Sequence, residues 1–140
     1  MVKIEDLMEK DQRTVRVKYI DEFELEIRYL PRSELGRMVE KSKESYWDKK
    51  DHTRLDRMNS DSFYTNFIKK VLVSWKGLTA LTLAKMIPVK LDDPNQEIDF
   101  SFENAFQLIR NAYDFDVFLQ NTCMDLDKFS GERAEAEKKI

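Results

Sequence analysis

Residues 72–78 read LVSWKGL, and the interpretation of this stretch decides the fold expected for the middle of the chain. Before it, apolar side chains recur at every third or fourth position, which is the spacing of the buried face of a helix. Trp75 extends that apolar stripe. Gly77 is the residue type that often follows a helix end, because glycine adopts the left-handed backbone conformation without strain. The stretch therefore predicts the end of a long helix that lines the core.

Residues 14–30, TVRVKYIDEFELEIRYL, alternate apolar and charged side chains with the period of a β-strand. A three-residue loop, Ile20-Asp21-Glu22, pairs Val17 with Leu25 on one face and opposite charges on the other. A two-residue loop would instead set apolar side chains against charged ones. Because matched partners stabilise a half-buried hairpin, we expect antiparallel strands joined by the three-residue loop.

The rest of the chain is expected to be helical. Residues 48–59 are almost wholly charged or polar and are interpreted as an exposed connection or a frayed helix. Capping side chains predict where the other helices begin. These caps are Ser33, Ser60 or Asp61, Thr79 and Ser101, and a last helix is expected around DVFLQNTCMDLDKF. The predicted fold class is α+β, mostly α, with an N-terminal β-hairpin followed by a bundle of four or five helices.

Length and composition favour a single domain. The chain has 140 residues, 41% of them hydrophobic, and its three glycines and three prolines mark no linker. We expect one domain over residues 1–140, with the hairpin at 14–30, a helical part at 33–129 and a charged tail at 130–140.

Charge and hydropathy narrow the function classes. The balance of 24 Lys and Arg against 27 Asp and Glu argues against nucleic-acid binding through phosphate neutralisation. No apolar run approaches the roughly 20 residues that span a bilayer, and the N-terminus lacks the apolar region of a signal peptide. The single cysteine excludes an internal disulfide framework. We therefore expect a cytoplasmic protein that binds neither nucleic acid nor membrane.

Few residues have the pattern of a catalytic or metal site. His52 lies among charged residues and is interpreted as a surface side chain, and Cys123 lies on an apolar stripe and is interpreted as a buried thiol. An acidic loop offers the alternative of a Mg²⁺ or Ca²⁺ site, although it lacks the central glycine of an EF-hand. The acidic residues are Asp92, Asp93, Glu97 and Asp99. We expect a solvated loop, no cofactor and no enzymatic activity.

Three short motifs, taken in order, resemble those of the tail assembly chaperones of long-tailed bacteriophages and prophages. The first is a helix ending in a Trp-x-Gly-hydrophobic step, the second a Phe-Ser-x-Glu helix start, and the third a Phe-rich closing helix before a charged end. The matching residues are Trp75, Gly77 and Leu78, then Phe100, Ser101, Glu103 and Ala105, then Phe118, Asp125 and Phe129. The resemblance covers roughly residues 14–140.

The resemblance implies a non-enzymatic role in the host bacterial cytoplasm. Such chaperones bind the tape measure protein, keep it soluble and help to recruit the tail tube protein around it. They tend to self-associate, and they are absent from the mature virion. A helical client suggests helix-in-groove binding at surplus apolar residues. The expected contact residues are Trp75, Leu78, Leu81, Leu83, Met86, Ile87, Phe118 and Phe129.

Two alternatives stay open. A small phage-encoded adaptor or regulatory protein that binds a host factor would have the same balanced charge and apolar surplus. A metal-dependent enzyme would need the acidic loop to converge with His52. The position of the gene would separate the first alternative from the chaperone, since tail chaperone genes lie between the tail tube and tape measure genes.

Overall fold

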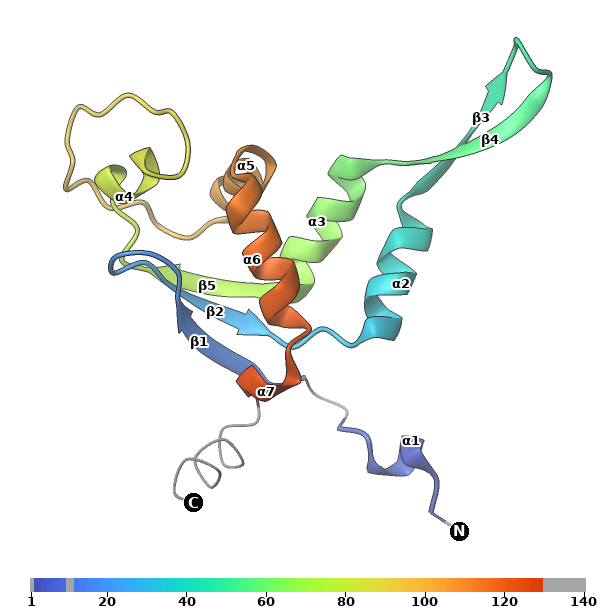
Figure 1. Ribbon diagram of the computed structural model, residues 1–140, viewed down its shortest axis with the longest axis horizontal. Coiled ribbons are helices and arrows are strands. Elements are labelled where there is room, and N and C mark those ends of the chain that lie inside the picture. The colour runs from blue at the N-terminus through green and yellow to red at the C-terminus, as the bar shows by residue number, and fades with distance from the viewer. Residues whose placement is uncertain (1, 10–11, 130–140) are drawn as a thin grey trace.

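The computed structural model describes residues 2–9 and 12–129. This part of the chain contains a three-stranded antiparallel sheet, in the order β1-β2-β5. It also contains a separate two-stranded hairpin, β3-β4, and several helices (Figure 1). The elements in chain order are α1 (Ile4–Leu7), β1 (Thr14–Lys18), β2 (Glu24–Arg28), α2 (Arg32–Lys41), β3 (Lys43–Asp48), β4 (Thr53–Met58), α3 (Ser60–Val71), β5 (Leu72–Lys76), α4 (Ala80–Ala84), α5 (Phe102–Asn111), α6 (Tyr113–Cys123) and α7 (Leu126–Phe129).

The β1–β2 hairpin confirms the register expected from the alternating sequence. Val17 pairs with Leu25, and the charged residues pair on the opposite face. The backbone N–H of Tyr19 donates a hydrogen bond to the carbonyl of Phe23 at 2.9 Å, so the connecting loop has three residues, as predicted. Asp21 supplies the left-handed conformation in this loop, with φ of 49°. The apolar side chains of β2 are fully buried, which explains why the register is so strongly specified.

The prediction that LVSWK ends a helix is wrong. Helix α3 ends at Val71, and residues 72–76 form β5, which pairs antiparallel with β2 so that Trp75 lies opposite Leu25. A lone hairpin is marginally stable, and β2 gains a second hydrogen-bonded neighbour when this segment is extended. Trp75 is buried in the strand, as it was expected to be in a helix, so the apolar pattern alone did not distinguish the two.

Gly77 does have the predicted left-handed conformation, with φ of 76°, but it follows a strand rather than a helix. A Cβ atom at this position would overlap the backbone carbonyl of Glu22 in the β1–β2 loop. The glycine therefore permits a close approach between the end of β5 and that loop.

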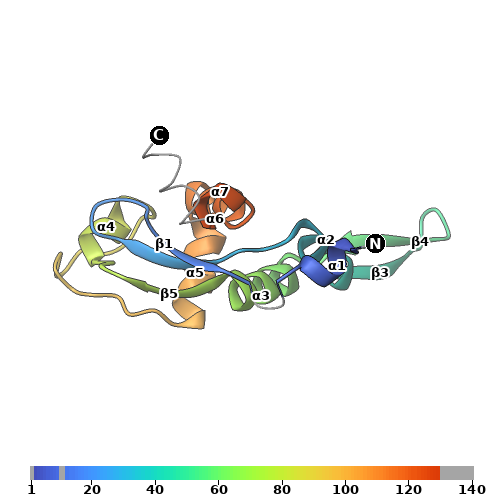
Figure 2. The ribbon, with the colours of Figure 1, turned by 90° about the horizontal axis from the view of Figure 1, so that it is seen from below.

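The expected helical bundle is also wrong. Residues 43–58, interpreted as the end of one helix and an exposed connection, form the β3–β4 hairpin, which extends away from the body (Figures 1 and 2). The last predicted helix is divided into α6 and α7 by a turn at residues 124–125. The architecture is instead an α+β fold in which helices pack on a central three-stranded sheet.

The predicted caps are partly confirmed. The side-chain oxygens of Thr79 and Ser101 accept the expected bonds from the backbone at the starts of α4 and α5. Helix α2 begins two residues earlier than a cap at Ser33 implies, after Pro31, and Ser33 does not cap it. Helix α3 is capped by Asn59, whose side chain accepts a bond from the Ser62 N–H at 3.0 Å. Asparagine is as good an N-cap as serine or aspartate, so the spacing alone favoured none of the three.

The core lies between the inward face of the sheet and helices α3, α5 and α6. Phe23 stacks on Phe115 with ring centroids 5.9 Å apart and meets Trp75 edge-on at 5.5 Å. A partly buried polar contact joins α3 to α6, because the Tyr64 hydroxyl donates to the carboxylate of Asp116 at 2.8 Å. Burial, together with this carboxylate, raises the pKa of Tyr64 to about 12. The core thus ties together elements that are distant in sequence.

Candidate protein-binding surfaces

The residues predicted to contact a client differ widely in exposure. Trp75, Leu78 and Phe129 are buried in the core, and Leu81 is exposed over 47% of its surface. The remaining residues are half-buried against the core, namely Leu83, Met86, Ile87 and Phe118. An extended partner surface built from all of them would require the core to open.

A cavity of about 90 Å³ brings part of the predicted set together between β5, α4 and α5. Trp75, Leu78, Leu83 and Ile87 contribute to its lining. The structure does not bring Phe118 and Phe129 to this cavity, since Phe118 packs on Tyr19 and Phe129 on Tyr29. The cavity is too small to hold a helix of another protein, and it is a packing feature of the fold.

Residues 78–100, here called the α4 lobe, fold around α4 at one end of the sheet (Figure 1). The Ile98 N–H donates to the Leu78 carbonyl at 2.8 Å, and Thr79 forms an isolated antiparallel β-bridge with Glu97. These contacts hold the two ends of the lobe together. Lys85 holds the lobe to the β1–β2 loop through a 2.8 Å ion pair with Asp21. The hydrogen bond that Lys85 donates to Asp21 lowers the pKa of the Asp21 carboxyl group. The exposed apolar side chains of the lobe are Leu81, Val89 and Leu91.

The acidic loop within this lobe does not assemble a metal site. Asp93 accepts a bond from the Asn95 N–H at 3.0 Å, which is a local turn contact. His52 lies in the turn of the β3–β4 hairpin, at the opposite end of the molecule in Figure 1. Within residues 2–9 and 12–129, no three His, Cys, Asp or Glu side chains are grouped so that they could hold a metal ion.

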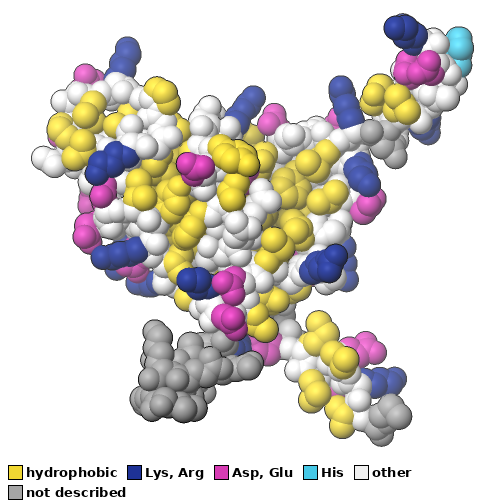
Figure 3. Space-filling view, viewed as in Figure 1, with side chains coloured by type: hydrophobic (Ala, Val, Ile, Leu, Met, Phe, Trp, Pro, Cys, Tyr) yellow, Lys and Arg dark blue, Asp and Glu magenta, His cyan; other side chains and the backbone are white. Residues whose placement is uncertain are grey.

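The β3–β4 hairpin, residues 43–58, is here called the arm, and it is the feature that the sequence interpretation missed. Its two strands pair along their full length, with Tyr46 opposite Leu55 and Trp47 opposite Arg54. Because successive side chains point to opposite faces, these pairs lie on the two faces of the arm. Trp47 is exposed over 58% of its surface and Tyr46 over 42%. Figure 3 shows the arm as a narrow projection that carries apolar and charged side chains side by side.

Local contacts explain why this charged segment forms a hairpin. The Asp48 carboxylate accepts a bond from the Lys50 N–H at 2.9 Å, and His52 adopts the left-handed conformation that the turn requires. The Arg57 guanidinium lies 5.3 Å from the centre of the Tyr46 ring and pairs with Glu44. Aromatic and threonine side chains, which favour strands, were the sequence signal available. That signal lacked the usual apolar-polar alternation, because neither face of the arm is buried.

Cys123 is completely buried, as predicted, and burial raises the pKa of its thiol to about 12. Since the thiolate is the reactive form, we expect the native protein to react with Ellman's reagent at pH 8 at least about a hundredfold more slowly than the unfolded chain. The measurement is the labelling rate with and without denaturant. Rapid labelling of the native protein would show that α6 opens readily.

Comparisons with protein-family models, curated proteins and solved structures found no significant match to this chain. None of the helices within the described residues is long and apolar enough to cross a membrane.

Proposed function

We propose that this protein is a phage tail assembly chaperone that binds the tape measure protein, keeps it soluble and promotes assembly of the tail tube protein around it. The proposal rests on the order of the three sequence motifs, the first of which ends a strand rather than a helix, and on one structural observation. That observation is the arm, which carries aromatic and aliphatic side chains away from the core. In this proposal the protein acts in the host bacterial cytoplasm and is absent from the mature virion.

An isolated two-stranded hairpin is marginally stable in water, and a group of exposed apolar side chains is typical of a surface that contacts a partner. The exposed apolar residues of the arm are Tyr46, Trp47, Leu55 and Met58. Tryptophan and tyrosine are enriched where proteins bind one another, and flanking charges keep such a surface soluble. The arm therefore supports protein binding rather than a chemical reaction.

The client contact differs from the one expected from sequence. Trp75 serves the core, so Trp47 replaces it as the tryptophan that meets the client. Leu81 on the α4 lobe is the member of the predicted set that is exposed enough to add a second contact. A helical client presents apolar side chains along one face, and short apolar patches framed by charge fit that pattern.

Co-expression with the tape measure protein from the same genome tests the proposal. We expect the chain to raise the soluble fraction of that protein and to co-purify with it. The double variant Trp47→Ser, Leu55→Ser should raise the Kd about thirtyfold or more, because truncating a central interface tryptophan typically costs about 2 kcal/mol or more. The measurement is titration calorimetry on the purified complex.

Tyr113→Ser is the matched control, since Tyr113 is an exposed aromatic residue outside the arm, with 78% of its surface accessible. It should leave the affinity unchanged. If no complex forms with the wild-type chain, the chaperone proposal fails. Capture of a host protein through the arm instead would favour the adaptor alternative.

A further inference from the structure

A basic groove of about 250 Å³ lies between α2 and α3. Its charged lining residues are Glu34, Arg37, Lys41, Lys69 and Lys70, and the buried Met38 adds an apolar side chain. Glu34 is already shared between Arg37, at 2.9 Å, and Lys70, at 4.0 Å. Positive charge therefore dominates here, although the chain as a whole carries a net charge of −3. Such a groove favours an acidic ligand that also offers apolar side chains.

The N-terminal segment of the same chain has this chemistry. All residues from 2 to 9 are exposed, and Ile4 and Leu7 are accessible over 79% and 73% of their surfaces. These two side chains lie one turn apart on the same side of α1. The acidic residues Glu5 and Asp6 stand between them in the sequence. The space-filling view shows the apolar side chains of this segment uncovered (Figure 3).

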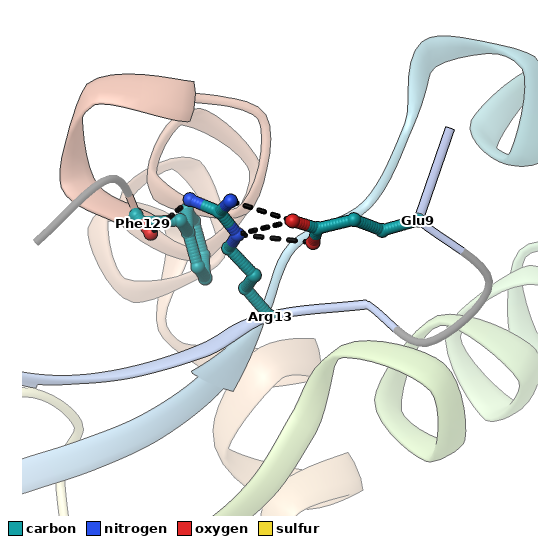
Figure 4. A network of polar contacts seen from close by, with 3 residues as sticks. All are labelled: Glu9, Arg13 and Phe129. Atoms are coloured by element: carbon teal, nitrogen blue, oxygen red, sulfur yellow. Dashed lines mark hydrogen bonds and ion pairs between the residues drawn. The ribbon is translucent and has the colours of Figure 1, made fainter. Parts of the chain in front are cut away.

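Polar contacts of Arg13 link the segment to the body. The Arg13 guanidinium contacts the Glu9 carboxylate at 2.6 Å and donates to the Phe129 carbonyl at 3.3 Å (Figure 4). The hydrogen bond from Arg13 also lowers the pKa of Glu9. Through Arg13, Glu9 lies near α7, and residues 2–9 project outward in Figure 1. A projecting, uncovered segment suits contact with a neighbouring molecule.

We infer that the α2–α3 groove binds the N-terminal segment, Val2–Glu9, of a second copy of this chain. The acidic side chains would face the lysines of the groove, and the apolar side chains would lie near Met38. The groove and the segment are different surfaces of the same chain. Each copy can therefore place its segment in the groove of a neighbour and accept a neighbour's segment in its own groove. The inference goes beyond client binding and does not depend on it, since neither surface includes the arm or the α4 lobe.

Charge exchange between two variants of the full-length chain tests the inference. The segment variant is Glu5→Lys, Asp6→Lys, and the groove variant is Lys41→Glu, Lys69→Glu. All four side chains are exposed, so the fold should tolerate the changes. We expect the wild-type chain to self-associate and each variant alone to associate at least about tenfold more weakly, because like charges brought face to face are strongly unfavourable. Sedimentation velocity over a range of concentrations gives the association constants.

An equimolar mixture of the two variants should recover association, since the reversed segment of one then meets the reversed groove of the other. Lys49→Glu, Lys50→Glu in the turn of the arm changes the net charge as the groove variant does and should leave association unchanged. A wild-type chain that stays monomeric overturns the inference. So does a mixture that fails to recover association, which would show that the wild-type chain associates through other surfaces.

Discussion

Trp75→Ala is expected to lower the free energy of unfolding by about 3–5 kcal/mol, the range for truncating a buried aromatic side chain. Only 7% of the Trp75 surface is accessible. Its ring meets Phe23 and Phe100 edge-on, and its indole N–H donates to the Ile98 carbonyl at 2.9 Å. The substitution removes one of the contacts that join the sheet to the α4 lobe, and it also removes apolar burial. Urea unfolding followed by circular dichroism measures the loss.

The chain contains a second tryptophan, which makes a matched control possible. Trp47→Ala removes the same side chain from the arm, where it is largely exposed. It should change the free energy of unfolding by less than about 0.5 kcal/mol, as surface substitutions usually do. A loss below about 1 kcal/mol for Trp75→Ala would contradict the burial of Trp75 in the core.

Gly77→Ala is expected to cost about 2–4 kcal/mol. The left-handed φ of 76° is unfavourable for alanine, and the added Cβ would overlap the backbone carbonyl of Glu22. That carbonyl belongs to the main chain of the β1–β2 loop and has no rotamer by which it could move aside. We expect the loop to shift away from β5, which would also disturb the contact between Asp21 and Lys85. The free energy of unfolding and the amide shifts of the loop are the measurements.

Gly36→Ala is the control for Gly77→Ala. Gly36 lies within α2, and nothing lies within 4 Å of a Cβ atom added there. Because alanine favours the helix by about 1 kcal/mol over glycine, this variant should be stabilised. If the free energy of unfolding falls for Gly77→Ala and rises for Gly36→Ala, the loss at Gly77 comes from its backbone conformation and not from a general effect of replacing glycine. Equal changes in the two variants would contradict a conformational requirement for glycine at position 77.

The sequence predicted the β1–β2 hairpin because two kinds of pairing, apolar and ionic, agree only in one register. It predicted the starts of α4 and α5 because a hydroxyl-bearing cap there precedes a clear apolar stripe. It failed at residues 72–76, where a stripe of helical spacing continues into a strand. The pairing of this segment with β2 is a contact between residues far apart in the chain, and no local pattern records it.

The arm was missed for a different reason. Periodicity identifies a strand through the contrast between a buried and a solvated face, and both faces of the arm are solvated. The sequence alone does not show that Trp47 is exposed and Trp75 is buried, because exposure depends on the residues that surround each ring in the fold. The surplus of apolar side chains was evident from composition, but their division between core and surface depends on the tertiary structure.

The Asn59 N–H donates to the Ser42 carbonyl at 2.7 Å, so the two ends of the arm are joined at its base. The residues beyond this closure contribute nothing to the central core. Substitutions, insertions or deletions within the arm are therefore insulated from the stability of the fold. In the proposed chaperone, the client-binding side chains of the arm can therefore vary without loss of stability in the scaffold.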